Sequence, residues 1–326
     1  MIIITGATGF IGSNIVASLN ARGRTDLLLV DDLGTQGKWK NIAKRRFVDL
    51  VDYRQLDSLL PTLGQAEAVF HMGANSSTTS SDGDEILRVN LHATMAWWKW
   101  CTSTQTPFIY ASSAATYGDG AQGFNDDQSL DALDQLAPLN LYGWSKHQFD
   151  KWAVERACEG KAPPQWVGLK FFNVYGPNEY HKGDMQSLVA KNTARIAQGD
   201  TVRLFKSHKE GYADGGQLRD FVYVKDCCAM MMWLLDNPQT SGLFNIGTGR
   251  AHSFLELMQA IGAALGKPVN VEYVDMPENI RPNYQYYTEA NMSKFRQVGG
   301  THQPHTLNEN VADYVNNYLI QADPYR

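Results

Sequence analysis

The chain has 326 residues, of which 43% are apolar and 19% are charged. It is therefore long enough for about two domains and apolar enough for a large core, which excludes wholesale disorder. A net charge of −5 argues against a broad basic surface for nucleic acid, so we expect a small-molecule partner and no nucleic-acid partner.

The first residues and the cysteines favour a cytoplasmic protein. No basic residue precedes Arg22, so the start does not resemble a signal peptide, and no apolar run approaches the roughly 20 residues that span a bilayer. The four cysteines form no C-x-x-C pair, which favours buried, reduced thiols. The eight histidines form no H-E-x-x-H array, and no metal site is predicted.

Short apolar segments alternate with longer helical patterns in the first half of the chain. This alternation predicts strands over 2–5, 27–30, 68–71, 108–111 and 167–172, and helices over 10–21, 83–101 and 141–159. Strands that are apolar throughout and separated by helices are typical of a parallel sheet covered on both faces. The sequence therefore predicts an α/β protein with a Rossmann-type, doubly wound parallel sheet.

The order loosens after about residue 173. The patterns predict helices over 187–198, 226–237, 253–265 and 307–319, strands over 202–205, 221–224 and 243–245, and a Gly-rich loop over 206–218. Ser253 should cap its helix and Gly266 should end it. We expect a first domain over 1–172, with returning segments near 221–246, and a smaller, interleaved domain over 173–326.

A glycine-rich turn follows the first predicted strand and opens the first predicted helix. Gly6 permits the tight turn, Gly9 lets the backbone approach a pyrophosphate, and Gly12 lets the helix pack closely on the sheet. The start of the helix then faces the anion. Because the triplet lies in this strand-to-helix context, it predicts a dinucleotide site.

The residues after the second strand leave the choice between NAD and NADP open. Asp31 ends that strand 19 residues after Gly12, where an acid usually accepts the ribose 2′-hydroxyl and favours NAD. The basic loop that follows includes Lys38, and a lysine there could instead pair with the 2′-phosphate of NADP.

Tyr142 and Lys146 are four residues apart in a predicted helix, so their side chains share one face. We expect the ammonium to lower the pKa of the phenol, which would let Tyr142 exchange a proton with a substrate alcohol. Ser113 follows the strand before this helix and could hydrogen-bond the reacting oxygen. These residues are predicted to carry the chemistry.

Four segments together resemble the extended short-chain dehydrogenase/reductase family. They are G-A-T-G-F-I-G from Gly6, the segment around Ser113, Y-G-W-S-K from Tyr142 and F-N-V-Y-G-P from Phe172, and the resemblance extends along the whole chain. It implies an enzyme with a nicotinamide cofactor. In that family Asp49 and Leu50 would lie at the adenine, and Asn90 would order the catalytic helix. The implied cofactor residues are Gly6, Gly9, Phe10, Ile11, Gly12, Asp31, Asp32, Lys38, Asp49, Leu50, Met72, Gly73, Ala74, Asn75, Ser76, Asn90, Lys146 and Val174.

Two further segments narrow the resemblance within the family. Ala114 and Ala115 stand where its sugar dehydratases carry Asp-Glu, and methyl groups cannot move protons, which argues against dehydration. The H-K-G-D-M segment over 181–185 is similar to a branch that epimerises the exocyclic C6″ carbon of an ADP-linked heptose, a precursor of the lipopolysaccharide inner core. That branch implies one NADP per subunit, retained through turnover with Lys38 near its 2′-phosphate, and a homo-oligomer, expected to be a pentamer.

The same resemblance assigns roles to the site residues. Tyr142 and Lys182 would transfer protons on opposite sides of C6″, Lys146 would hold the nicotinamide ribose, and Ser113 would contact the sugar. The implied substrate residues are Ser113, Asn173, Lys182, Asp184, Lys191, Phe205, Lys206, Ser207, His208, Arg219 and Tyr284. Asp184 and Lys191 depart from the serine and histidine usual there, and the 206–218 loop is longer than usual.

Other activities remain open at this stage. Another nucleotide-sugar epimerase or dehydrogenase of the same family would keep Tyr142 and Lys146 but give Lys182 no role. A regulator that only senses the cofactor would have the fold without turnover. The sequence does not indicate which of Tyr142 and Lys182 serves which epimer.

Overall fold

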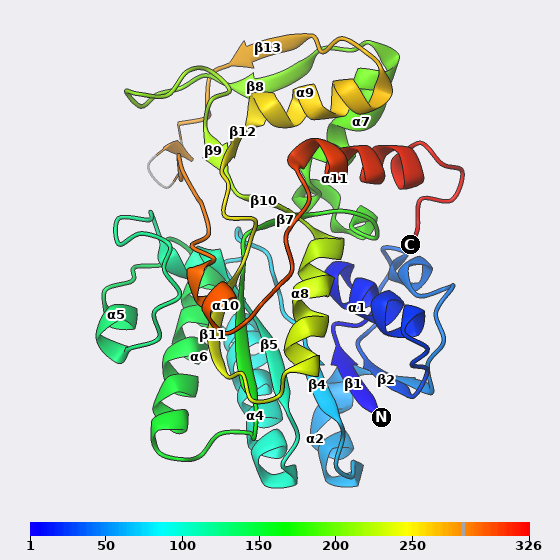
Figure 1. The fold of residues 1–326 in the computed structure, drawn as a ribbon, viewed down its shortest axis with the longest axis vertical. Helices are drawn as coiled ribbons and strands as arrows, with labels where there is room; N and C mark the ends of the chain where they lie inside the picture. Colours follow the sequence, from blue (N-terminus) through cyan, green and yellow to red (C-terminus); the bar gives the residue numbers. More distant parts are fainter. Residues whose placement is uncertain (279, 282–283) are drawn as a thin grey trace.

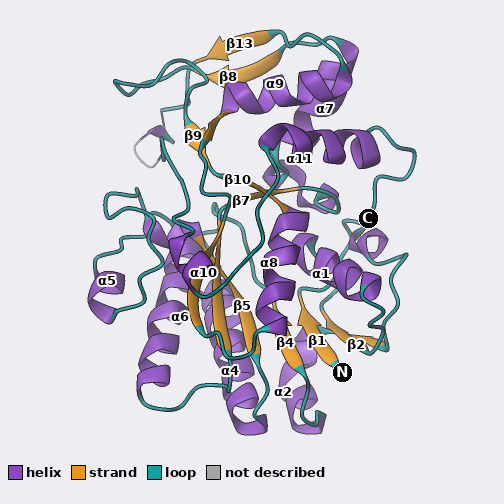
Figure 2. Cartoon of the chain, viewed as in Figure 1, coloured by secondary structure: helices purple, strands orange, loops and turns teal. Residues whose placement is uncertain are grey.

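A computed structural model of the chain describes residues 1–278, 280–281 and 284–326. Its centre is a sheet of seven strands in the order β11-β6-β5-β4-β1-β2-β3 (Figures 1 and 2). All neighbouring strands pair in parallel, and the order reverses between β1 and β4, which confirms the predicted doubly wound, Rossmann-type fold. The strands are β1 (Ile2–Thr5), β2 (Leu27–Val30), β3 (Asp49–Val51), β4 (Ala68–His71), β5 (Phe108–Ser113), β6 (Trp166–Phe171) and β11 (Gly242–Ile246).

Helices cover both faces of this sheet and create two separate cores. One core joins the sheet to α1 (Phe10–Ala21) and α8 (Val224–Asp236), and the other joins it to α4 (Ala93–Thr104) and α6 (Leu141–Cys158). Side chains of a strand alternate between the faces, so Ile2 and Ile4 enter the first core and Ile3 the second. This burial on both sides explains why the strands are apolar throughout.

A smaller part lies beyond the carboxyl ends of the sheet strands, at the top of Figure 1. Its core packs helices against a parallel pair of strands. Two further strand pairs, β7 with β10 and β9 with β12, join it to the larger part. The elements are β7 (Asn173–Tyr175), α7 (Leu188–Gln198), β8 (Val202–Phe205), β9 (Leu218–Arg219), β10 (Phe221–Tyr223), β12 (His252–Ser253), α9 (Phe254–Leu265), β13 (Val271–Val274) and α11 (Leu307–Tyr314).

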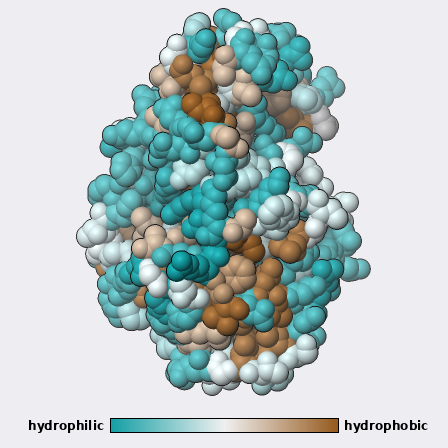
Figure 3. Space-filling model, turned by 90° about the vertical axis from the view of Figure 1, so that its right-hand side faces the viewer, coloured by the Kyte–Doolittle hydropathy of each residue, from teal (hydrophilic) through white to brown (hydrophobic). Residues whose placement is uncertain are grey.

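Short helical segments fill the connections. The α-helical ones are α2 (Leu56–Leu59), α3 (Gly83–Ile86), α5 (Leu130–Asp134) and α10 (Ser293–Gln297). The tighter or wider turns are η1 (Lys38–Asn41), η2 (Tyr53–Gln55), η3 (Leu60–Thr62), η4 (Leu87–His92), η5 (Ala114–Tyr117), η6 (Tyr180–Met185) and η8 (Val315–Leu319). In the described part of the chain, no helix is long and apolar enough to cross a membrane. Figure 3 shows a largely hydrophilic face with an apolar patch on its lower half.

The predicted bounds agree best in the first βαβ unit, where β1, α1 and β2 begin and end as expected. Ser253 caps α9 through a reciprocal capping box with Glu256, and Gly266 ends that helix in the left-handed conformation, as predicted. The sequence analysis missed β3 and β13 and the short strands β7, β9 and β12, and it placed the end of β5 two residues too early. The chain returns from the smaller part to the sheet at β11, so the parts are interleaved as expected. The division at residue 172 stays a prediction.

Candidate active site

The glycine-rich turn between β1 and α1 leaves space that a larger residue would fill. Gly6 has a φ of +63°, and a Cβ added at Gly12 would lie 2.1 Å from the Gly6 carbonyl oxygen. Gly9 is the N-cap of α1 and has no side chain to cap it, so the first amide N–H groups of the helix remain available to an anion. This cradle fits the pyrophosphate of a nicotinamide dinucleotide.

A cavity of about 580 Å³ opens at this turn, and we call it the first cavity. It gathers most of the predicted cofactor residues and all four predicted catalytic residues. Its predicted members are Gly6, Gly9, Phe10, Ile11, Gly12, Asp31, Lys38, Met72, Gly73, Ala74, Asn75, Ser76, Ser113, Tyr142, Lys146, Val174 and Lys182. A smaller cavity of about 210 Å³ shares Gly6, Asp31 and Lys38 with it and adds Asp32.

A second cavity, of about 630 Å³, adjoins the first. The two share Ser113, Tyr142, Phe171 and Phe172, so Tyr142 stands where a ligand in one would meet a ligand in the other. Predicted substrate residues Asn173, Arg219 and Tyr284 line the second cavity, together with Ala114 and Ala115. The sequence analysis missed Thr78, Asn140, Gln285 and Thr288, which also line it.

Several predicted residues line none of these cavities. Asp49 and Leu50 lie on the edge strand β3, where Asp49 is exposed and its carboxylate accepts the Leu50 N–H. The Asp184 carbonyl accepts a hydrogen bond from Lys191, which turns both residues toward one another. No residue of the segment 205–208 lines the second cavity, although the Phe205 ring centroid lies 6.3 Å from that of Tyr284, which does. Their predicted ligand contacts therefore stay predictions.

Close packing holds Tyr142 beside Ser113. Asn140 caps α6 by accepting the Gly143 N–H at 2.8 Å, and a Cβ at Gly143 would lie 2.8 Å from the Ala115 carbonyl oxygen. Only glycine at this position lets the first turn of α6 approach η5 so closely. Ser113 ends β5, and its hydroxyl accepts the Ala115 N–H at 3.1 Å. The helix start and the strand end are thus locked together around the phenol.

The pKa shifts of Tyr142 and Lys146 differ from the sequence prediction. Burial raises the pKa of Tyr142, and the neighbouring Ser113 hydroxyl only partly offsets this. Burial also lowers the pKa of Lys146 to about 8, against the opposing charge of Asp150. The expected lowering of the Tyr142 pKa by Lys146 is therefore wrong, because the loss of water on burial outweighs the Ser113 hydrogen bond and the Asp150 charge also raises this pKa.

Asn90 is fully buried and does not line the first cavity. Its side-chain oxygen accepts the Asn75 N–H at 2.8 Å, and its amide nitrogen donates to the Asn75 carbonyl and to Ser145 on α6. It thereby joins the loop after β4 to the helix that carries Tyr142 and Lys146. This is the geometry of a residue that orders the catalytic helix.

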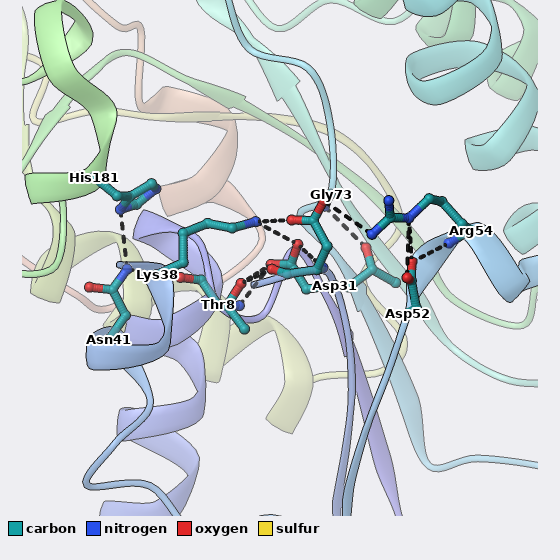
Figure 4. Close-up of polar contacts among 10 residues, drawn as sticks. Thr8, Asp31, Lys38, Asn41, Asp52, Arg54, Gly73 and His181 are labelled. Atoms are coloured by element: carbon teal, nitrogen blue, oxygen red, sulfur yellow. Dashed lines mark hydrogen bonds and ion pairs between the residues drawn. The ribbon is translucent and has the colours of Figure 1, made fainter. Parts of the chain in front are cut away.

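The acidic residue after β2 is already engaged by protein groups (Figure 4). Asp31 accepts hydrogen bonds from the Thr8 N–H at 2.8 Å and the Thr8 hydroxyl at 2.7 Å, and it pairs with Lys38 at 3.0 Å. Lys38 also pairs with Asp32 at 2.6 Å, and although burial lowers its pKa, these carboxylates raise it overall. Arg54, which the sequence analysis missed, lies 3.8 Å from Asp32.

Lys182 reaches the first cavity from η6, a segment that enters from the side of the smaller part. Its ammonium lies 5.4 Å from the centroid of the Phe10 ring, and burial lowers its pKa while Glu179 opposes this. Glu179 anchors the segment by accepting hydrogen bonds from Ser187 and Tyr314. A lysine with a lowered pKa that lines the same cavity as Tyr142 can act as a proton-transfer group.

Arg219 is buried in the wall of the second cavity. Its guanidinium carbon lies 5.2 and 5.6 Å from the ring centroids of Tyr284 and Phe254, and the guanidinium donates to the Gln285 carbonyl. A planar cation held by aromatic rings suits a diphosphate.

Comparison with known proteins agrees with this arrangement. The profile of the NAD dependent epimerase/dehydratase family matches residues 2–247. The chain is 48% identical to the ADP-L-glycero-D-manno-heptose-6-epimerase of Fusobacterium nucleatum and 47% identical to that of Nitratidesulfovibrio vulgaris, each over 100% of both chains.

Solved structures agree as well. The Helicobacter pylori ADP-L-glycero-D-manno-heptose-6-epimerase superimposes with a TM-score of 0.79 at 26% identity, over 97% of this chain and 95% of that one. The Thermus thermophilus UDP-glucose 4-epimerase in complex with NAD superimposes with a TM-score of 0.74 at 26% identity, over 97% and 98%. The chain therefore belongs to the NAD-dependent epimerase/dehydratase family.

Proposed function

We propose that this enzyme converts ADP-D-glycero-D-manno-heptose into ADP-L-glycero-D-manno-heptose by inverting C6″, and so supplies the heptose precursor of the lipopolysaccharide inner core. The observation that carries the proposal is that Tyr142 and Lys182, from different parts of the fold, line one cavity at the dinucleotide turn. Full-length relatives at 47–48% identity bear the name of this epimerase and support the substrate.

The residues divide the work by position. The glycine-rich turn and Lys146 would hold a nicotinamide dinucleotide in the first cavity, and this group would supply reversible hydride transfer at C6″. Tyr142 and Lys182 carry the hydroxyl proton, one for each orientation of the oxygen at C6″. Lys146 holds the nicotinamide ribose, and Ser113 and Asn173 hold the sugar.

The second cavity would hold the rest of the substrate. Arg219 and Tyr284 suit the ADP diphosphate, because they form a stacked cationic wall. The proposed contacts of the 205–208 segment would require the long 206–218 loop to move toward this cavity. Those of Asp184 and Lys191 would require the end of η6 and the start of α7 to approach it. Ala114 and Ala115 line it with methyl groups, so no acid–base pair for dehydration stands there.

The cofactor belongs to the nicotinamide dinucleotides, and we propose NADP as the form bound. Asp31 already accepts three hydrogen bonds from Thr8 and Lys38, which leaves it a poor acceptor for a ribose hydroxyl. Lys38 lines the first cavity and would turn from the carboxylates to a 2′-phosphate. The dissociation constants of NADP and NAD, measured with the wild type and Lys38→Met, test this. Tighter NADP binding that Lys38→Met abolishes is expected; equal affinities would reject it.

The activity is tested by incubating the protein with ADP-D-glycero-D-manno-heptose and following the L-glycero product and any release of nucleotide. Product with the nucleotide retained is expected. Lys182→Met should slow the reaction by about 10²–10⁴-fold. Lys267→Met, at an exposed lysine that lines neither cavity, serves as the matched control. No product, with turnover of a UDP-sugar instead, would favour another epimerase or dehydrogenase of the family.

We also propose a cytoplasmic homo-oligomer, a pentamer as the resemblance implies. Light scattering of the purified protein gives the subunit number, and a monomer would reject an oligomer. Fractionation of the source cells locates the enzyme.

A further inference from the structure

Two adjacent residues of the η6 segment contact the start of α1 and the end of η1. Lys182 lies over the ring of Phe10, the first residue of α1. His181 contacts Asn41, with 3.2 Å between the His181 Nδ1 and the Asn41 Nδ2 atoms (Figure 4). The mechanism proposed above uses Lys182 and gives His181 no role.

The partners of Asn41 fix the protonation of His181. Asn41 is buried at the end of η1, and its Nδ2 donates to the Thr8 carbonyl at 2.8 Å. A carbonyl can only accept, so this bond fixes which end of the amide is the nitrogen. The second hydrogen on Nδ2 then points to His181 Nδ1, which must accept it. The imidazole therefore carries its proton on Nε2.

The ring remains neutral at physiological pH. Burial lowers the pKa of His181 to about 4, and the charges of Lys38 and Lys182 act in the same direction, whereas Asp31 opposes them. The His181 ring lines the first cavity, as do the glycine-rich turn and Lys38. The Asn178 backbone also contacts the ring and raises its pKa. Among the described residues no well-aligned hydrogen bond engages Nε2, so this N–H can turn to a ligand.

We propose that His181 is a positioning residue that sets Lys182 against the dinucleotide turn and donates its Nε2 hydrogen to a phosphate oxygen of the bound dinucleotide. The inference rests on the proposed function for the role of Lys182. Nδ1 of the ring is linked to the turn through Asn41 and the Thr8 carbonyl, and Nε2 donates to the ligand. Binding of the dinucleotide thus holds the second proton-transfer group in place.

Two substitutions of similar size separate this role from general packing. His181→Phe keeps a ring but has neither acceptor nor donor. His181→Gln offers a carbonyl to Asn41 and an N–H to the cavity, so it should rescue both contacts. His92→Ala, at an exposed histidine of η4, is the control for loss of a histidine as such.

The first measurement is the exchange rate of bound NADP against labelled NADP. We expect His181→Phe to weaken retention by about tenfold, as for loss of one hydrogen bond, and His181→Gln to restore it. The second is the rate of nucleotide reduction with each C6″ epimer separately. His181→Phe should slow nucleotide reduction by roughly 10–100-fold with the epimer whose proton Lys182 transfers. The rate with the epimer whose proton Tyr142 transfers should be nearly unchanged.

Specific outcomes overturn the inference. Unchanged nucleotide exchange in His181→Phe, or equal loss with both epimers together with a lower melting temperature, would reduce His181 to a packing residue. If the wild type does not epimerise the heptose, the proposed function fails, and the exchange measurement still decides whether His181 contacts the nucleotide.

Discussion

A fully buried ion pair lies beneath the catalytic face of α6. Lys170 of β6 donates to the Asp150 carboxylate at 2.9 Å, and both side chains are fully excluded from solvent. Asp150 also accepts hydrogen bonds from Tyr110 and Ser112 of β5. It lies two helical turns after Tyr142, so the pair ties both strands to the helix that carries the reactive residues.

Replacing Lys170 by Met should destabilise the protein strongly. The substitution leaves the Asp150 charge buried without its cation, which costs about 3–5 kcal/mol in comparable pairs. With an unfolding entropy of about 2.1 cal/mol/K per residue, a chain of this length has about 0.7 kcal/mol/K, so the melting temperature should fall by about 4–7 °C. Calorimetry of the ligand-free protein measures this directly.

A double substitution tests the reasoning further. Combining Lys170→Met with Asp150→Asn removes both charges, so the double variant should lose less stability than the two single losses together, by about 0.5–3 kcal/mol. Lys161→Met removes a lysine from an exposed pair and should leave the melting temperature within about 1 °C. A Lys170→Met protein as stable as that control would refute the idea that the pair supports the site.

Three further outcomes are expected. Tyr142→Phe should lower epimerisation by about 10²–10⁴-fold while the nucleotide stays bound; a near-normal rate in the coupled product assay would remove Tyr142 from proton transfer. Lys146→Met should raise the unfolding free energy at pH 7 by about 3 kcal/mol, because burial lowers the Lys146 pKa to about 8. This gain should shrink between pH 8 and about 10.5, where the native lysine loses its proton before the unfolded one, and a constant gain across that range would contradict the burial argument. Gly12→Ala should abolish nucleotide retention, since its Cβ would lie 2.1 Å from the Gly6 carbonyl oxygen, whereas Gly64→Ala, with open space around it, should bind normally by absorbance.

Local patterns in the sequence were sufficient for the first βαβ unit and for the shared position of Tyr142 and Lys146. β1 and β2 are apolar at every position because each side of the sheet is covered, and the glycine spacing between them has meaning only in a strand-to-helix turn. The spacing of Tyr142 and Lys146 likewise predicted a shared helix face, and both side chains do line one cavity.

Only the tertiary structure decided what surrounds these groups. Strands β3 and β13 were missed because each is short and only partly buried, so neither carries a strong apolar pattern. Thr8 and Asp31 are 23 residues apart in the sequence, and Asn41 and His181 are 140 residues apart. No local sequence pattern predicts either contact. The pKa of Tyr142 depends on how completely folding removes water from the phenol. Spacing along a helix determines which side chains are neighbours, whereas desolvation and long-range partners depend on every element packed around them.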